Sequence, residues 1–179
     1  MAKSSAYAIF LIAGILIGFL AGVLYAGTNG PVDRGGQVAV TCFSPAGNCS
    51  SVVVSWIERA NKSVHVLMFT FTLETILDSL ILAKGRGVEV LVVLEREQEA
   101  NQQAYEILLA AGVEVRKDNN SGLMHSKFAV IDDLVVITGS YNWTKSADTI
   151  NDENLLVIVS HQIAVAFDQE FGRVWEISS

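Results

Sequence analysis

Two residues with chemically active side chains, His125 and Lys127, stand two positions apart in the segment 124–144, MHSKFAVIDDLVVITGSYNWT. The rest of this segment is typical of a β-hairpin, because two apolar runs flank a polar pair of aspartates. In a strand, residues i and i+2 point to the same face, so the imidazole and the ammonium group should project together. An imidazole can act as a nucleophile or proton donor, and a neighbouring ammonium group favours a bound anion. The spacing therefore predicts an anion site.

A second group of polar residues, Gly139, Ser140 and Asn142, follows the second strand of the expected hairpin. A hairpin that turns at residues 132–133 brings this part of the chain back beside His125. Ser140 would then offer a hydroxyl donor, and Asn142 an amide donor, to the same anion. These donors, together with a glycine that leaves the backbone flexible, suit a phosphate better than a carboxylate substrate.

Together these residues resemble the signature of the phospholipase D superfamily. The pattern H-x-K-x-x-x-x-D is met by His125, Lys127 and Asp132, and G-S-x-N follows at residues 139–142. The chain is similar in particular to the small single-motif Nuc-type endonucleases, because CFSPAG, VLMFTFT, NWT and ENL also match their pattern. The resemblance covers roughly residues 38–177.

The resemblance implies a role for each matching side chain. His125 corresponds to the nucleophile, which attacks phosphorus to give a phosphohistidine, and Lys127 and Asn142 correspond to phosphate ligands with Ser140 near them. Glu153 stands where the family has an acid that accepts a hydrogen bond from the other ring nitrogen of the histidine. Such a carboxylate would fix the tautomer in which the attacking nitrogen carries a lone pair.

Two further motif residues, Asp132 and Gly139, are expected to be structural, with Asp132 holding the hairpin turn. The family chemistry needs a second histidine as general acid, yet neither His65 nor His161 is followed by a lysine two residues on. His65 is expected to face the core or a helix, and His161 to begin a helix. The resemblance therefore implies a homodimer with the active site at its two-fold interface, and no metal or other cofactor.

The elements that must position these residues alternate between strands and helices. Besides the hairpin, apolar runs predict strands at 37–43, 63–69, 88–94, 113–118 and 153–159, and helical spacing predicts helices at 49–62, 72–85, 98–112 and 161–178. The predicted fold class is α/β, with a mixed, mostly parallel β-sheet flanked by helices on both faces, as in the phospholipase D-like fold.

An N-terminal transmembrane helix is expected to precede this fold. Residues 6–26 form a continuous, uncharged apolar run, close to the roughly 20 residues that cross a bilayer. This length favours an uncleaved anchor over a cleavable signal sequence, and glycines at 14, 18 and 22 favour self-association of the helix. The chain thus divides into an anchor or signal sequence (1–27), a linker (28–37) and a phospholipase D-like catalytic domain (38–179).

The positive charge of Lys3 before the span indicates a cytoplasmic N-terminus and an extracytoplasmic catalytic domain. Cleavage of residues 1–26 would instead give a secreted or periplasmic protein. Cys42 and Cys49 flank a turn that contains Pro45 and Gly47, so they are either two ordinary thiols or a short disulfide loop. An oxidising compartment favours the disulfide.

The net charge of −7, from 19 acidic and 12 basic residues, excludes the overall basic surface of a non-specific nucleic-acid binder. A local positive patch of Arg116, Lys117 and Lys145 could still attract a polyanion. Tyr141 and Trp143 are expected to pack under the serine loop rather than to stack on bases.

The favoured function is a metal-independent phosphodiesterase, a nuclease that acts on DNA or RNA. A phospholipase D or phosphatidyl transferase that acts on phospholipids is the alternative, because a domain tethered to a bilayer lies beside lipid head groups. An inactive membrane-bound binding module is a second alternative, which the complete motif disfavours.

Overall fold

The computed structural model describes residues 36–179, so the predicted anchor and nearly all of the linker lie outside the described residues. In chain order the elements are β1 (Gln37–Ser44), α2 (Cys49–Ile57), β2 (Ser63–Met68), α3 (Glu74–Gly85), β3 (Glu89–Leu94), the 3-10 turn η1 (Glu99–Asn101), α4 (Gln102–Ala110), β4 (Glu114–Lys117), β5 (Lys127–Ile131), β6 (Val135–Gly139), α5 (Lys145–Thr149), β7 (Glu153–Val159) and α6 (His161–Ile177). The expected strands and helices are present, although the helix expected at 49–62 ends at Ile57.

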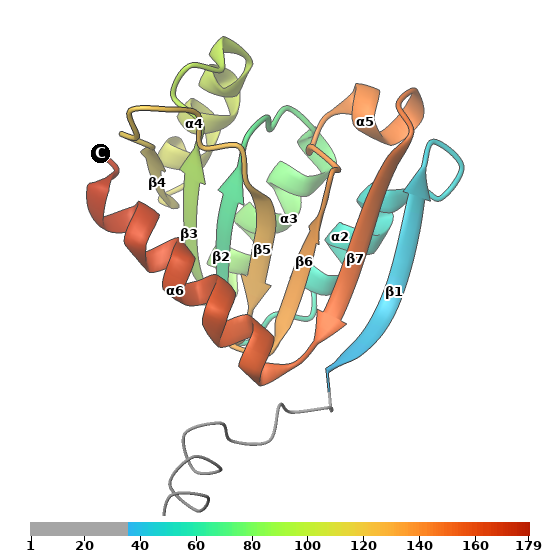
Figure 1. The fold of residues 1–179 in the computed structure, drawn as a ribbon. Coiled ribbons are helices and arrows are strands. Elements are labelled where there is room, and N and C mark those ends of the chain that lie inside the picture. The colour runs from blue at the N-terminus through green and yellow to red at the C-terminus, as the bar shows by residue number, and fades with distance from the viewer. Residues whose placement is uncertain (1–35) are drawn as a thin grey trace, which may run out of the picture. The chain divides into compact units, whose positions relative to one another are not determined.

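Within residues 36–179 seven strands form one sheet in the order β1-β7-β6-β5-β2-β3-β4 (Figure 1). The α/β class and the mixed sheet are confirmed, but the expectation of mostly parallel pairing is wrong. Only β2 with β3, and β3 with β4, pair in parallel, whereas the other four pairings of the described strands are antiparallel. The connection between β5 and β6 shows why, because residues 132–134 are too few for the crossover that parallel strands need.

The two faces of the sheet are covered by different layers. Helices α2, α3 and α4 cover one face, and α6 runs across the other (Figure 1). Strand β5 illustrates the alternation, since Ala129 and Ile131 belong to the core beneath α2 to α4. Phe128 and Val130 point the other way, into a smaller core that includes Phe171 of α6. This burial on both faces fixes the register of β5 and therefore the direction of the residues just before it.

The strand ends that carry the candidate site meet at one edge of the sheet, the upper edge in Figure 1. Lys127 at the start of β5 pairs with Met68 at the end of β2, and Met68 pairs with Leu94 at the end of β3. One residue further, the Phe69 N–H donates to the Ser126 carbonyl at 3.0 Å. The residues that follow β2 and β3 therefore lie beside those that precede β5.

Cys42 and Cys49 form a disulfide, and both residues are buried. This finding confirms the disulfide loop rather than two ordinary thiols. The bond joins the end of β1 to the start of α2, and Ser44 at the end of β1 pairs with Glu153 at the start of β7. The disulfide thus braces the β1 side of the edge that carries the candidate site. Among residues 36–179 no helix has the length and apolar character needed to cross a membrane.

Candidate active site

His125 and Lys127 lie together at the upper edge of the sheet, as their spacing predicts. The Lys127 Nζ atom is 3.3 and 3.4 Å from the two ring nitrogens of His125 and donates to the His125 carbonyl at 2.8 Å. The ring of Phe69 packs against both side chains, with its centroid 4.2 Å from the imidazole centroid and 4.8 Å from Lys127 Nζ. The imidazole is solvent-exposed on its other side, so a substrate can reach it.

An open cavity of about 440 Å³ adjoins this pair. It is lined by residues of β5, β6 and α6 and by the two residues before β5, namely His125, Ser126, Lys127, Phe128, Thr138, Gly139, Ala166, Phe167 and Glu170. The Phe128 and Phe167 rings meet edge to face in its wall, with centroids 4.9 Å apart. The histidine and the lysine therefore line a cavity whose remaining wall is mostly apolar but includes Thr138 and the carboxylate of Glu170.

Ser140 and Asn142 follow β6 and come back to the same edge, as the hairpin argument predicts. The Asn142 side-chain oxygen accepts the Thr70 N–H at 3.2 Å. Because that oxygen is engaged, the amide NH2 group is the end of Asn142 that can donate to a phosphate. The Ser140 hydroxyl donates to Glu153 and accepts the Asn154 N–H at 3.0 Å, so its orientation is fixed.

Glu153 lies beside Ser140 at the start of β7, and its carboxylate accepts hydrogen bonds from Ser140 and from Asn151 Nδ2. The predicted hydrogen bond between Glu153 and the ring of His125 is not formed within the described chain. Glu153 is nevertheless close enough to act on Lys127. Burial lowers the pKa of the Lys127 ammonium group, and the negative charge of Glu153 opposes that shift.

Gly139 ends β6 with a φ of 152°, a conformation that side chains with a Cβ rarely adopt. A Cβ atom there would lie 2.1 Å from the carbonyl oxygen of Asn154, so only glycine fits at this end of the β6–β7 pairing. The next aromatic residues, Tyr141 and Trp143, are buried, which confirms that they pack beneath the loop. The Tyr141 hydroxyl donates to Asp148 at 2.6 Å, and burial followed by this contact raises the tyrosine pKa.

Asp132 lies at the opposite end of β5 from His125. Its carboxylate accepts the backbone N–H groups of Asn61, Lys62 and Ser63 at 2.7 to 3.1 Å. Burial alone would raise the pKa of this carboxyl, but these hydrogen bonds outweigh burial and lower the pKa. The contacts tie the hairpin turn to the segment between α2 and β2, which is the structural role expected for Asp132.

The other two histidines lie away from the site. His65 in β2 faces α6, and its Nδ1 atom is 2.6 Å from Oδ1 of Asp168 in that helix. Its Nε2 atom is 3.2 Å from Oε1 of Glu89 at the start of β3. His161 begins α6, as expected, and its Nδ1 atom is 2.8 Å from the Asp133 carbonyl in the hairpin turn. That turn is at the far end of β5, so neither histidine can reach the leaving group beside His125 in the same chain.

The three basic residues expected to form a positive patch are engaged differently. Arg116 stacks on Trp175, with its guanidinium carbon 3.9 Å from the ring centroid, and donates to the Trp175 carbonyl at 2.8 Å. Lys117 donates to Gln102 at 2.7 Å. Both residues are on β4, the strand at the end of the sheet, whereas Lys145 begins α5 above β6 and β7 (Figure 1). They do not form one continuous patch.

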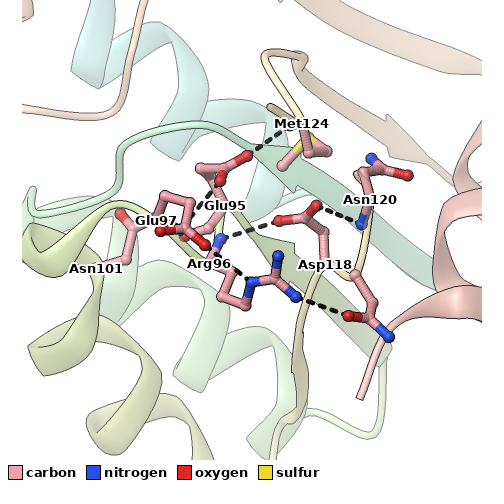
Figure 2. A network of polar contacts seen from close by, with 8 residues as sticks. Glu95, Arg96, Glu97, Asn101, Asp118, Asn120 and Met124 are labelled. Atoms are coloured by element: carbon pink, nitrogen blue, oxygen red, sulfur yellow. Dashed lines mark hydrogen bonds and ion pairs between the residues drawn. The ribbon is translucent and has the colours of Figure 1, made fainter. Parts of the chain in front are cut away.

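Two buried polar residues near the site, Glu95 and Asn101, are absent from the sequence-based expectations. Figure 2 shows them in a network of polar contacts that reaches the backbone of Met124, the residue before His125. Glu95 could have been recognised from its position in the sequence. It directly follows the apolar run VEVLVVL, with no turn residue between the run and the charged side chain.

With this geometry in view, the comparisons with known proteins identify the family. A family model described as "Cardiolipin synthase, PLD-like domain" matches residues 53–175. The chain belongs to the phospholipase D-like family. Residues 53–175 include the whole His125 to Glu153 region and all strands except β1.

Curated phospholipase D-like relatives include proteins with different names. A "Mitochondrial cardiolipin hydrolase" of Xenopus tropicalis is 41% identical over 119 residues, which cover 66% of this chain and 57% of that protein. A "Phospholipase D" of Rickettsia prowazekii is 35% identical over 133 residues, which cover 73% of this chain and 64% of that protein. The chain thus spans less than two thirds of the length of these two relatives.

Solved structures of phospholipase D-like proteins superpose on most of the chain. Nuc from Salmonella typhimurium, described as a phospholipase D family member, has a TM-score of 0.76 and 31% identity, covering 80% of this chain and 97% of that one. NucT from Helicobacter pylori has a TM-score of 0.71 at 23% identity, covering 80% of this chain and 98% of that one, a likeness of fold.

Proposed function

We propose that this phospholipase D-like chain is a phosphodiesterase in which His125 attacks phosphorus. The observation that carries the proposal is the position of the Lys127 ammonium group, 3.3 Å from a nitrogen of the exposed His125 imidazole in the wall of an open cavity. An ammonium group there attracts a phosphodiester to the nucleophile and stabilises the charge that develops on its oxygens. Asn142 approaches from the other strand of the hairpin and would donate to the same phosphate, with Ser140 beside it; the Ser140 hydroxyl proton is donated to Glu153.

The proposed reaction has two steps. A ring nitrogen of His125 forms a bond to phosphorus while the bond from phosphorus to the leaving oxygen breaks, and that oxygen takes a proton from a second histidine. Water then attacks the phosphohistidine, gives up a proton to the same second histidine, and releases His125 and a phosphomonoester. Lys127 and the amide of Asn142 stabilise charge in both steps, so the proposal does not require a metal ion.

The second histidine is proposed to come from a second copy of the chain. His65 is held against α6 and His161 lies at the far end of β5, so the chain offers no second imidazole of its own beside His125. We propose a homodimer in which the two His125 side chains face each other across a two-fold axis. Glu153 does not contact the histidine of its own chain, because its carboxylate accepts from Ser140 and Asn151.

The central experiment uses purified full-length protein and bis(p-nitrophenyl) phosphate in excess EDTA. We expect turnover that EDTA does not reduce, and we expect His125→Ala to abolish it. His161→Ala is the matched control, because it removes an exposed imidazole 36 positions away that the mechanism does not use. Loss of turnover in EDTA would refute the metal-free mechanism, and appreciable turnover by His125→Ala would refute the assignment of the nucleophile.

The dimer has its own test. Specific activity should fall on dilution below the dissociation constant of the dimer, and light scattering at each concentration should report the change in mass. An active monomer would contradict a site shared between two copies. Because the predicted anchor would itself promote association, the measurement is made in detergent at a fixed ratio of micelles to protein.

For the substrate we propose a nucleic acid first, in line with the likeness to Nuc. Phospholipid is a second candidate that a specific observation favours. Phe43 near the end of β1, Leu123 in the β4–β5 connection and Ile150 directly after α5 are 65%, 59% and 73% exposed, and a lipid surface at the catalytic edge could contact them. A side-by-side assay of single-stranded DNA, duplex DNA, RNA and cardiolipin or phosphatidylcholine vesicles distinguishes the two classes.

We also propose that residues 1–27 anchor the catalytic domain to a membrane, with residues 38–179 on the extracytoplasmic side. The disulfide between Cys42 and Cys49 supports this topology, because disulfides persist in oxidising compartments. Protease added to sealed spheroplasts should degrade the catalytic domain. Protection of the domain until the membrane is permeabilised would contradict this orientation.

A further inference from the structure

A buried carboxylate lies directly behind the proposed nucleophile. Glu95 is the first residue after β3 and is 1% exposed. One of its oxygens accepts the backbone N–H of Met124, and the other accepts the backbone N–H of Glu97 at 3.0 Å. Figure 2 shows the carboxylate pointing toward the Met124 backbone. Since Met124 directly precedes His125, Glu95 holds the peptide from which the histidine projects.

The energetic cost of burying the Glu95 carboxylate indicates that this side chain does more than fill space in the core. Removing a carboxylate from water is expensive unless its oxygens are well compensated. The ion pairs among residues 36–179 do not include Glu95, so backbone N–H groups provide its compensation. Hydrogen bonds to a charged acceptor are about twice as strong as neutral ones. A charge at this position therefore holds the Met124 N–H more firmly than a neutral acceptor would.

A second buried residue, Asn101, extends the same support to the other side of the imidazole. It is 1% exposed, and its Nδ2 atom donates to the carbonyls of Phe69 at 2.9 Å and Glu95 at 3.0 Å. The Phe69 ring is the one that packs on His125. The Glu95 carboxylate therefore holds the backbone that precedes the histidine, and Asn101 joins the backbone carbonyl of Glu95 to that of Phe69, whose ring packs on the imidazole.

We infer that Glu95 is a positioning residue, which sets the place and direction of the His125 imidazole through the backbone of Met124. The inference rests on the proposed role of His125 as the nucleophile. A nucleophile that is displaced by about 1 Å can lose roughly 100-fold in rate. Glu95 does not touch the substrate, so its loss should lower kcat by about 10- to 100-fold and leave KM nearly unchanged.

The structure offers a matched control in Asp118, which is 2% exposed and belongs to the same network (Figure 2). Its carboxylate also accepts two backbone N–H groups, those of Arg96 at 2.9 Å and Asn120 at 3.1 Å. Neither donor adjoins the nucleophile. Glu95→Gln and Asp118→Asn each replace one acceptor oxygen with an NH2 group at a buried site, so both variants should lose similar amounts of thermal stability.

The test compares kcat and KM of full-length Glu95→Gln and Asp118→Asn with those of the unmodified chain, using bis(p-nitrophenyl) phosphate at a temperature at which all three are folded. We expect the 10- to 100-fold fall in kcat for Glu95→Gln and less than about 3-fold for Asp118→Asn. Equal losses in the two variants would overturn the inference, because they would follow stability rather than position. A kcat within 3-fold of the unmodified chain for Glu95→Gln would also overturn it.

A second readout does not depend on activity. The chain has three histidines, so selective ¹⁵N labelling of histidine gives three imidazole spin systems. In Glu95→Gln we expect shifted signals from His125 and weaker nuclear Overhauser contacts between His125 and Phe69, with the His65 and His161 signals unchanged. Asp118→Asn should leave all three unchanged. An unperturbed His125 in Glu95→Gln would overturn the inference even if the unmodified chain proved to lack diesterase activity.

Glu95→Asp covers the case in which the glutamine variant does not fold. It keeps the charge but withdraws both oxygens by one methylene group, so the Met124 N–H would be held less closely. We expect an intermediate fall in kcat and the same direction of change in the His125 signals. Wild-type kcat and an unchanged His125 spectrum in Glu95→Asp would refute the positioning role. If the unmodified chain shows no turnover, the proposed function fails, and the spectra alone decide the role of Glu95.

Discussion

Asp132 is the aspartate of the H-x-K-x-x-x-x-D pattern, yet its contacts predict that Asp132→Ala lowers stability and leaves catalysis nearly unchanged. Its carboxylate accepts three backbone N–H groups, from Asn61, Lys62 and Ser63. Hydrogen bonds to a charged group contribute about 1.5–3 kcal/mol each when buried, and we halve the lower value because Asp132 is partly exposed, which gives about 2 kcal/mol for three. The residue has a φ of 54°, which costs alanine about 1 kcal/mol more.

The total of about 3 kcal/mol corresponds to a fall in Tm of about 6–12 °C for a chain of this size. Thermal unfolding followed by circular dichroism measures it, and kcat at 25 °C should stay within about 3-fold. Asp132 lies about 16 Å along β5 from Lys127, at 3.3 Å per residue. Asp132→Asn is the control, because asparagine tolerates a positive φ and keeps one acceptor oxygen, so we expect about 1 kcal/mol.

The pH dependence of the unfolding free energy tests the same prediction in a second way. The folded-state pKa of Asp132 is below its ordinary value of 3.8, so its contribution is fully present above that value and is lost as pH falls through the folded-state pKa. The difference in unfolding free energy between the unmodified chain and Asp132→Asn should therefore shrink below about pH 4. A fall in kcat of more than about 100-fold without a change in Tm would refute the reasoning, since it would make Asp132 part of the chemistry.

Three further outcomes follow from the structure. Because burial lowers the Lys127 pKa, the midpoint of the alkaline limb in the pH profile of kcat/KM should lie below pH 10.5. Lys127→Met should remove that limb together with most activity, and a midpoint above pH 10.5 would contradict the assignment. Reduction of the Cys42–Cys49 disulfide should cost about 2–3 kcal/mol for so short a loop, seen as a lower Tm in dithiothreitol and absent in a Cys42→Ala/Cys49→Ala variant. His65→Ala should lower Tm through lost contacts with α6 but leave kcat within about 3-fold, and a larger kinetic loss at unchanged Tm would assign His65 a role in catalysis.

The elements of the fold could be predicted because their signals are local. Apolar runs and helical spacing predicted all seven strands and the long helices, and β7 was predicted with its observed bounds. The pairing of the strands could not be predicted in the same way. Whether β1 joins β7, far away in the sequence, depends on which apolar faces remain unburied once the hairpin and the βα units have packed.

The same difference between local and long-range signals applies to the candidate site. The contact between His125 and Lys127 follows from a two-residue period, which a strand imposes on any sequence. The partner of Glu153 does not follow from any period, because it depends on how β7 is placed beside the serine loop, and there the carboxylate binds Ser140 rather than His125. Glu95 was missed for a related reason, since a glutamate after a strand is usually a solvated loop residue and only the path of the β4–β5 connection buries it.

The arrangement of the site also bears on how one chemistry could serve different substrates. The side chains that the proposed mechanism uses, His125, Lys127 and Asn142, can recognise only the phosphodiester group that nucleic acids and phospholipids share. Discrimination must then come from the groups around them, which are the apolar cavity wall against α6 and the exposed apolar residues of the catalytic edge. Substitutions in that wall, such as Phe167→Ala, would change KM for one substrate class relative to the other, whereas substitutions behind the nucleophile, such as Glu95→Gln, would lower kcat for both.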